Sequence, residues 1–135
     1  MGLNISDRRV MNGEPILLDT NAFIYFFEGR AKVAEYILLA ETIYYSVISE
    51  IELLSASQLT AQDIATIGEF LNRCQRVDLT PAIVERAITL RKEYRLKTPD
   101  AIIASSALSL DVILITADKR MNRIAGLHTL TDILN

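Results

Sequence analysis

The sequence is poor in the residues that cross-link a chain or bind zinc. One cysteine, Cys74, and one histidine, His128, occur in 135 residues. A single cysteine cannot form an intramolecular disulfide, and one Cys with one His falls short of a zinc ligand set. We therefore interpret both residues as structural.

Long apolar runs are also missing. No run reaches the roughly 18 residues needed to span a bilayer. The first residues, MGLNISDRRVMNGE, carry charges and turn formers where a secretory signal needs an apolar segment. We therefore expect a soluble, cytoplasmic protein that does not associate with membranes.

An excess of positive charge is absent as well. The formal net charge of -3 argues against a protein that coats nucleic acid, because phosphate affinity comes largely from Lys and Arg. The distribution is uneven: residues 1–70 hold 4 Lys and Arg against 10 Asp and Glu, whereas residues 71–135 hold 10 against 7. Two interpretations of the basic part remain open, a solvated helix face and a rim that contacts phosphates. The clustered basic residues are Arg86, Arg91, Lys92, Arg95 and Lys97, then Lys119, Arg120 and Arg123.

The pattern of apolar residues predicts an α/β fold. Half of the residues are hydrophobic, and the length suits one domain with a single core. Short apolar runs alternate with longer helical patterns, which is typical of βαβ units around a mostly parallel sheet of roughly five strands. The expected strands are Ile16–Leu18, Ile43–Val47, Arg76–Leu79, Val112–Thr116 and a weak fifth near His128–Thr129.

Three segments predict helices from their first residues. In residues 60–74, Thr60 and Asp63 have a spacing close to that of a capping box. Residues 80–94 and 98–110 each begin with Thr-Pro, in which Thr suits the N-cap and Pro the first helical position. The apolar residues expected on one face of the first helix are Ile64, Ile67 and Leu71.

The N-terminal segment fits none of these elements. We expect residues 1–14 to form a flexible extension, or to play no part in the fold, ahead of a single domain over residues 15–135.

Three aspartates are expected at one edge of the sheet. Asp19 ends the first strand, Asp118 follows the strand VILIT by two residues, and Asp100 lies near the start of the helix that begins at Pro99. In open parallel sheets, ligands bind beyond the carboxyl ends of the strands, so the three carboxylates could converge there. Each also has a structural interpretation, as a helix cap or as a charge that complements a helix dipole.

Four motifs, in order, resemble those of PIN domains. LLDTNAFIYFFEG is similar to the opening motif, YSVISEIELLSA to the second, TPDAIIASSAL to the third and VILITADKRM to the fourth. The set covers nearly everything from Pro15 to the C-terminus and most resembles short VapC-type toxins of toxin–antitoxin systems. The resemblance implies a PIN-like three-layer α/β/α domain.

The resemblance also implies an acidic site. Its members would be Asp19, Glu52, Asp100 and Asp118, with Asn21 and Thr116 as polar supports. Glu50 competes with Glu52, because the two lie about 200° apart on a helix and each borders the apolar stripe. The family pattern of Glu followed by Leu favours Glu52.

Such a cluster calls for a cation, since adjacent carboxylates repel one another. Oxygen-only ligands suit Mg²⁺ or Mn²⁺, and we expect direct coordination mainly by Asp19 with Asp118 or Asp100. This chemistry suits phosphodiester hydrolysis without a protein nucleophile. Flanking phosphates would then meet a basic rim, for which the candidates are Lys97, Lys119 and Arg120.

Beyond the chemistry, the resemblance implies an RNA-cleaving toxin that forms homodimers and is blocked by a cognate antitoxin. The consecutive aromatic residues Tyr25, Phe26 and Phe27 cannot all face the core, so they provide either a partner surface or ordinary packing. Two alternatives remain: a PIN-like module that binds RNA or a partner without cutting, and a phosphoryl-transfer domain of the haloacid dehalogenase or receiver type. The dehalogenase pattern would need an aspartate where Asn21 stands.

Overall fold

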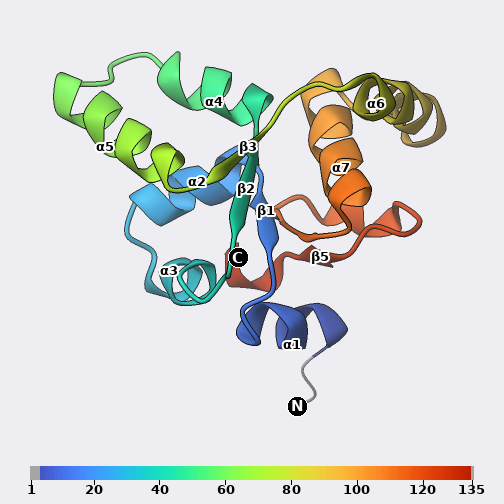
Figure 1. Cartoon of the computed structure of the whole chain (residues 1–135), viewed down its shortest axis with the longest axis horizontal. Helices are drawn as coiled ribbons and strands as arrows, with labels where there is room; N and C mark the ends of the chain where they lie inside the picture. The colour runs from blue at the N-terminus through green and yellow to red at the C-terminus, as the bar shows by residue number, and fades with distance from the viewer. Residues whose placement is uncertain (1–3, 135) are drawn as a thin grey trace.

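A five-stranded sheet forms the centre of the protein. The structure is a computed structural model that describes residues 4–134. Its strands are β1 (Ile16–Leu18), β2 (Ile43–Ser46), β3 (Gln75–Val77), β4 (Ile113–Ile115) and β5 (Thr129–Leu130). They lie in the order β3-β2-β1-β4-β5, and each neighbouring pair is parallel (Figure 1). The expected α/β class with a parallel sheet is confirmed.

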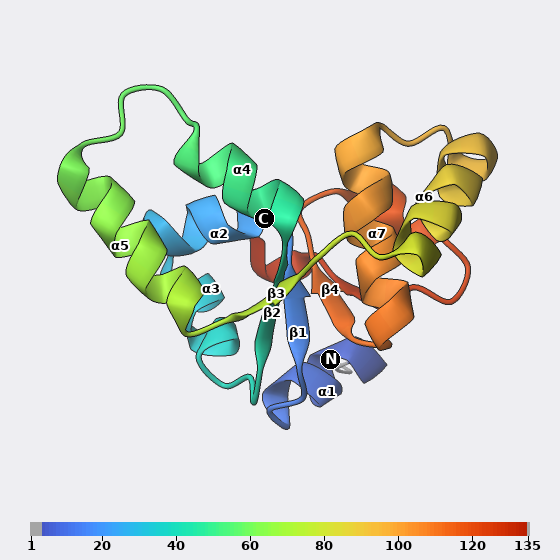
Figure 2. The ribbon, with the colours of Figure 1, turned by 45° about the horizontal axis from the view of Figure 1, so that its top comes forward.

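Helices cover both faces of the sheet and give three layers. On one side lie α2, α3, α4 and α5, and on the other α6 and α7 (Figure 2). Their bounds are α2 Thr20–Phe27, α3 Ala31–Ile37, α4 Val47–Leu54, α5 Ala61–Asn72, α6 Pro81–Tyr94 and α7 Thr98–Leu110, with 3₁₀ helices η1 Lys119–Arg123 and η2 Asp132–Leu134.

The central strand shows why the sheet is apolar throughout. Ile16 and Leu18 belong to the core cluster shared with α2, α3 and α5, whereas Leu17 belongs to the cluster shared with α6 and α7. Successive side chains of a strand point to opposite faces, so a strand covered on both sides needs an apolar residue at every position. All three residues are fully buried.

Capping residues set the helix starts. The helices depart from the predictions at one start and at one buried position. Thr60 and Asp63 form the expected capping box, and the Thr80 hydroxyl accepts the Ile83 N–H. Helix α7 begins at Thr98 itself, one residue earlier than predicted, and its N-cap is Lys97. The prediction that Ile64 shares the buried face of α5 was also wrong: Ile64 is 48% exposed and all of residues 61–66 are exposed, whereas Ile67 and Leu71 are buried. 

The N-terminal segment departs most from its prediction. Helix α1 spans Ile5–Met11, begins with a capping box between Asn4 and Asp7, and buries Val10 completely in the core. The expectation that this segment forms no element is therefore wrong for residues 5–11; its first three residues lie outside the described part of the chain. Figure 1 shows α1 at the end of the sheet where β1 begins.

The strand order decides where a ligand can bind. The chain adds β2 and β3 on one side of β1 and then β4 and β5 on the other. Such a reversal opens a crevice at the carboxyl ends of the two strands that flank it, here β1 and β4. Among residues 4–134, no helix is both long and apolar enough to cross a membrane.

Candidate active site

Asp19 lies at this crevice and caps a helix at the same time. Its N–H donates to the Ile115 carbonyl at 3.1 Å, which extends the pairing of β1 with β4 by one residue. Its carboxylate accepts the Ala22 N–H at 2.7 Å and so forms the N-cap of α2. The structural and functional interpretations of Asp19 are therefore compatible, because one carboxylate can do both.

Burial raises the pKa of the Asp19 carboxyl above its ordinary value. The nearby charges of Asp100 and Asp118 raise it further, whereas hydrogen bonds from Thr116 and from the Ala22 N–H oppose the rise. The surroundings of Asp19 thus disfavour a negative charge on its carboxyl group.

A small cleft of about 140 Å³ brings the predicted residues together. Three of the four predicted acids line it, Asp19, Glu52 and Asp100, and Asn21 lines it as well. The remaining lining residues are Thr20, Pro99 and Ile103. Residues separated by about 80 positions in the sequence therefore share one cavity.

The structure separates the two competing glutamates. The Thr20 hydroxyl donates to Glu52 at 2.6 Å and lies 2.9 Å from the hydroxyl of the buried Ser49. Glu50 instead accepts from Tyr45 and pairs with Arg76, away from the cleft. Sequence reasoning missed Thr20, because only the packing of α2 on α4, which carries both Ser49 and Glu52, brings the Thr20 hydroxyl to the glutamate.

Asp100 faces the cleft from the first turn of α7. Its pKa is raised, chiefly by burial and next by the charge of Asp118, and Glu52 adds to the rise. Arg120 and Lys97 act in the opposite direction. The charges of Asp118 and Glu52 therefore both act on Asp100.

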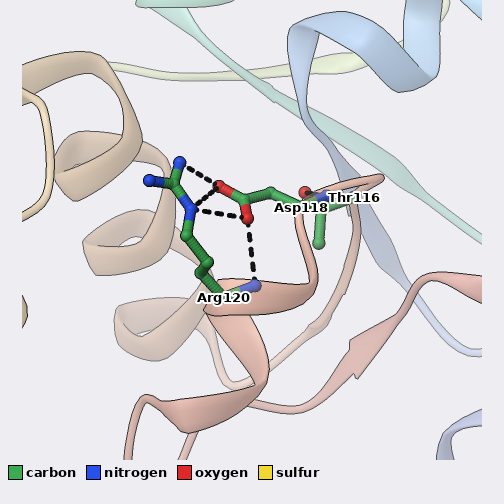
Figure 3. A network of polar contacts seen from close by, with 3 residues as sticks. All are labelled: Thr116, Asp118 and Arg120. Carbon is green, nitrogen blue, oxygen red and sulfur yellow. Dashed lines mark hydrogen bonds and ion pairs between the residues drawn. The ribbon is translucent and has the colours of Figure 1, made fainter.

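Asp118 lies beside the cleft and is turned toward Arg120. Thr116, fully buried after β4, accepts the Asp118 N–H at 3.1 Å, and the Arg120 guanidinium binds both carboxylate oxygens of Asp118 (Figure 3). Hydrogen bonding to Arg120 is the main reason why the pKa of Asp118 is lowered, and the charge of Arg123 contributes. Asp118 is the one predicted acid that has a cationic partner in direct contact.

The predicted rim residues are all at the surface. Lys97 is exposed at the N-cap of α7, and its charge reaches Asp100. Lys119 and Arg120 are exposed at the start of η1. The two residues set aside as structural lie elsewhere: His128 is exposed, and Cys74 is half-buried with its thiol donating to the Phe70 carbonyl at 3.3 Å.

The aromatic residues of α2 serve mainly as packing. Phe26 and Phe27 pack against Phe70 of α5 with ring centroids 4.6 and 5.7 Å apart, and Tyr25 lies under the guanidinium of Arg30. All three are half-buried. Next to them, an apolar groove of about 300 Å³ runs between α2, α4 and α5 and shares Glu52 with the acidic cleft.

The donor chemistry fits a hard divalent cation. The available ligands are carboxylate oxygens, and two of the three carboxyls lining the cleft have raised pKa values that a cation would relieve. Within residues 4–134, no group of three acidic, histidine or cysteine side chains is already gathered as a metal cage. Three of the four predicted acids have other partners: Asp19 accepts a backbone N–H, Glu52 accepts the Thr20 hydroxyl and Asp118 pairs with Arg120.

These features are those of a PIN domain. The model of the PIN domain family matches residues 16–127, and the chain belongs to that family. The prediction from the four motifs is thereby confirmed, and the haloacid dehalogenase and receiver alternatives are disfavoured.

Solved structures with the same fold come from toxin–antitoxin systems. A chain of the toxin–antitoxin complex from Klebsiella pneumoniae is 29% identical with a TM-score of 0.76, covering 86% of this chain and 96% of that one. A chain of VapBC2 from Rickettsia felis, bound to a promoter DNA fragment, is 26% identical with a TM-score of 0.76, covering 86% and 97%. A chain of VapBC-1 from Haemophilus influenzae is 29% identical with a TM-score of 0.73, covering 86% and 96%.

No curated protein matches the chain. The family match and the structural neighbours support the predicted class, a toxin nuclease of the PIN family that most resembles the VapC type.

Proposed function

We propose that the protein is an endoribonuclease that hydrolyses RNA phosphodiester bonds with Mg²⁺, for which Mn²⁺ can substitute. The observation that carries the proposal is the cleft at the ends of β1 and β4, where Asp19, Glu52 and Asp100 converge. Asp19 and Asp100 both have raised pKa values, so a bound cation would stabilise their charged forms.

Each residue has a part in this proposal. Asp19, Asp100 and Asp118 would hold the cation, and Glu52, which also lines the cleft, is oriented by a hydrogen bond from the Thr20 hydroxyl. Thr116 links Asp19 and Asp118 by hydrogen bonds, and Asn21 supplies a polar group at the mouth. When bound, the cation supplies positive charge to the phosphodiester and lowers the pKa of the attacking water.

Basic residues on the cleft side of α7 and η1 hold the RNA in this proposal. Lys97 and Lys119 are exposed and have no ion-pair partner among the salt bridges of residues 4–134, so their charges are available to phosphates. Replacing each with Gln should weaken RNA binding for all sequences alike and reduce the salt dependence by about one phosphate contact per lysine. Unchanged affinity and salt dependence in the double variant would contradict this part.

We further propose that the protein is a toxin, acts in the cytoplasm as a homodimer and is inhibited by a cognate antitoxin. Support for the toxin and antitoxin parts of this proposal comes from the toxin–antitoxin complexes among its structural neighbours. An antitoxin arginine entering the acidic cleft would neutralise carboxylates that otherwise hold the cation. Antitoxin and Mg²⁺ should therefore compete, which a metal titration of the complex tests.

Cleavage of a mixed pool of structured and single-stranded RNA tests the activity. The purified protein is assayed with Mg²⁺, Mn²⁺ or EDTA, beside Asp19→Asn, Asp100→Asn and, as a matched control outside the cleft, Glu50→Gln. We expect metal-dependent cleavage that both Asp variants lose and the control retains. Full cleavage by either Asp variant would contradict the assigned site.

One alternative is distinguished by the same experiment. If the wild-type protein binds metal in calorimetry and binds RNA, yet cuts no RNA under any condition, the catalytically silent PIN-like module replaces the nuclease as the better conclusion.

A further inference from the structure

Arg120 binds both carboxylate oxygens of Asp118. In the proposed function, Asp118 is one of the ligands of the cation. Arg120 Nε lies 3.0 and 3.2 Å from the two carboxylate oxygens, and Nη2 lies 2.7 Å from Oδ2 (Figure 3). The Arg120 N–H donates to Oδ1 at 3.0 Å as well. Both oxygens are thus engaged by a residue two positions along the chain.

The two partners differ in how easily they can move. The Asp118 side chain is 25% exposed and follows Thr116 at the end of β4, whereas the Arg120 side chain is 64% exposed. The guanidinium therefore covers the carboxylate from the solvent side, and it can swing away into water without unpacking the core. Forked arginine–carboxylate pairs of this kind are stronger than an ordinary surface ion pair, yet weak enough for a bound cation to displace the arginine.

The guanidinium also acts on more than one acid of the site. Its positive charge reaches Asp100 as well as Asp118, so it partly neutralises two of the carboxylates around the cleft. A charge in this position does part of what a bound cation would do.

We propose that Arg120 is a displaceable internal counter-ion of the site. It holds Asp118 while no divalent cation is bound, and a cation gains Asp118 only by displacing it. The inference rests on the proposed function, in which Asp118 is a cation ligand. Its consequence is that the affinity of the protein for metal is set by competition with its own arginine.

The test is calorimetric titration of the full chain with Mg²⁺ and with Mn²⁺, in the absence of RNA. The variants are Arg120→Gln and the matched control Arg123→Gln, which removes the same charge from η1 but acts on Asp118 only through space. Since the lost pair is forked on a carboxylate that is mostly buried, we expect Arg120→Gln to bind either metal about three to five times more tightly. The control should change the dissociation constant by less than about twofold.

A second readout does not depend on binding heats. In EDTA, Arg120→Gln should melt at a lower temperature than the wild type, because the acids lose their counter-charge. Addition of Mg²⁺ should then raise its melting temperature by more than it raises that of the wild type.

Two results would overturn the inference while leaving the proposed function intact. An unchanged dissociation constant in Arg120→Gln would mean that Arg120 does not compete with the metal for Asp118. A larger dissociation constant, that is weaker binding, would mean that Arg120 orients Asp118 for the metal. If neither the wild type nor Arg120→Gln binds metal, the proposed cation site fails and the inference fails with it. Asp19→Asn shows whether an observed heat comes from the cleft, because it should abolish the titration only in that case.

Discussion

Asp19 has two roles that can be separated by two substitutions. It caps α2 through the Ala22 N–H, and it places a negative charge in a cleft that already holds Asp100. Asn is as good an N-cap as Asp but carries no charge, whereas Ala can do neither. Asp19→Asn therefore removes the proposed cation ligand and keeps the cap, and Asp19→Ala removes both.

The structure gives the size of the difference. Loss of an N-cap side chain costs about 1 kcal/mol, which for a domain of this length corresponds to a melting temperature lower by about 3–5 °C. The pKa of Asp19 is raised chiefly by burial, so its charged form costs stability at neutral pH. In EDTA we expect Asp19→Asn to be at least as stable as the wild type, and Asp19→Ala to melt below Asp19→Asn by the amount that the cap is worth.

Thermal unfolding in EDTA and in Mg²⁺ measures both roles at once. Mg²⁺ should stabilise the wild type and neither variant, because a ligand of the native state raises its stability only where it binds. The reasoning is refuted if Asp19→Asn loses as much stability in EDTA as Asp19→Ala does. It is equally refuted if Mg²⁺ still raises the melting temperature of Asp19→Asn.

Three further predictions concern parts of the molecule away from the cleft. Val10→Ala should lower the free energy of unfolding by about 1–3 kcal/mol, measured by urea denaturation, whereas Ile5→Ala on the exposed side of the same helix should change it by less than about 0.5 kcal/mol; equal effects would show that α1 does not pack as described. Hydrogen bonds from Thr60, chiefly from its backbone N–H, lower the pKa of the Asp63 carboxyl. The charged carboxylate therefore stabilises the fold fully above the unfolded pKa near 3.8, and this stabilisation is lost as the pH falls through the lower folded pKa. The stability difference between the wild type and Asp63→Asn should therefore be constant at neutral pH and shrink in acid, and a difference that grows in acid would contradict the capping box. Burial raises the pKa of the Cys74 thiol to about 11, so iodoacetamide at pH 8 should modify the folded protein roughly 10–100 times more slowly than the urea-unfolded chain, and equal rates would show that the thiol is not held as described.

The sheet and most helix starts could be predicted because their signals are local. Runs such as VILIT are buried on both faces and so stay apolar at every position. The caps at Thr60 and Thr80 depend on side chains three residues or fewer from the backbone groups that they bind. Asp19 was placed correctly for a similar reason, since a residue that follows the first strand directly must lie at the carboxyl edge of the sheet.

The glutamate that lines the cleft could not be chosen from local signals. Glu50 and Glu52 border the same apolar stripe, so helical periodicity treats them alike. What separates them is the Thr20 hydroxyl, 32 residues away in the sequence, and only the packing of α2 against α4 brings it into contact. Only the family pattern of Glu followed by Leu pointed to Glu52.

Two further features of the structure have local signals in the sequence. Asn4 and Asp7 have capping-box spacing, but a seven-residue helix with one buried residue shows no apolar period. Asp118 and Arg120 are two residues apart, and that spacing suffices for a forked ion pair once the chain turns into η1.

The pairing of β1 with β4 determines when the cleft can form during synthesis of the chain. Ile16 lies opposite Ile43 of β2 and Ile113 of β4, so the strand that precedes Asp19 gains its second neighbour only after β4 has been synthesised. Asp100, Thr116 and Asp118 are also late residues. A nascent chain emerging from the ribosome therefore cannot assemble the cleft, and contacts of such long sequence separation form slowly. For a protein proposed to cut RNA, this delay would keep the growing chain inert beside the messenger that encodes it.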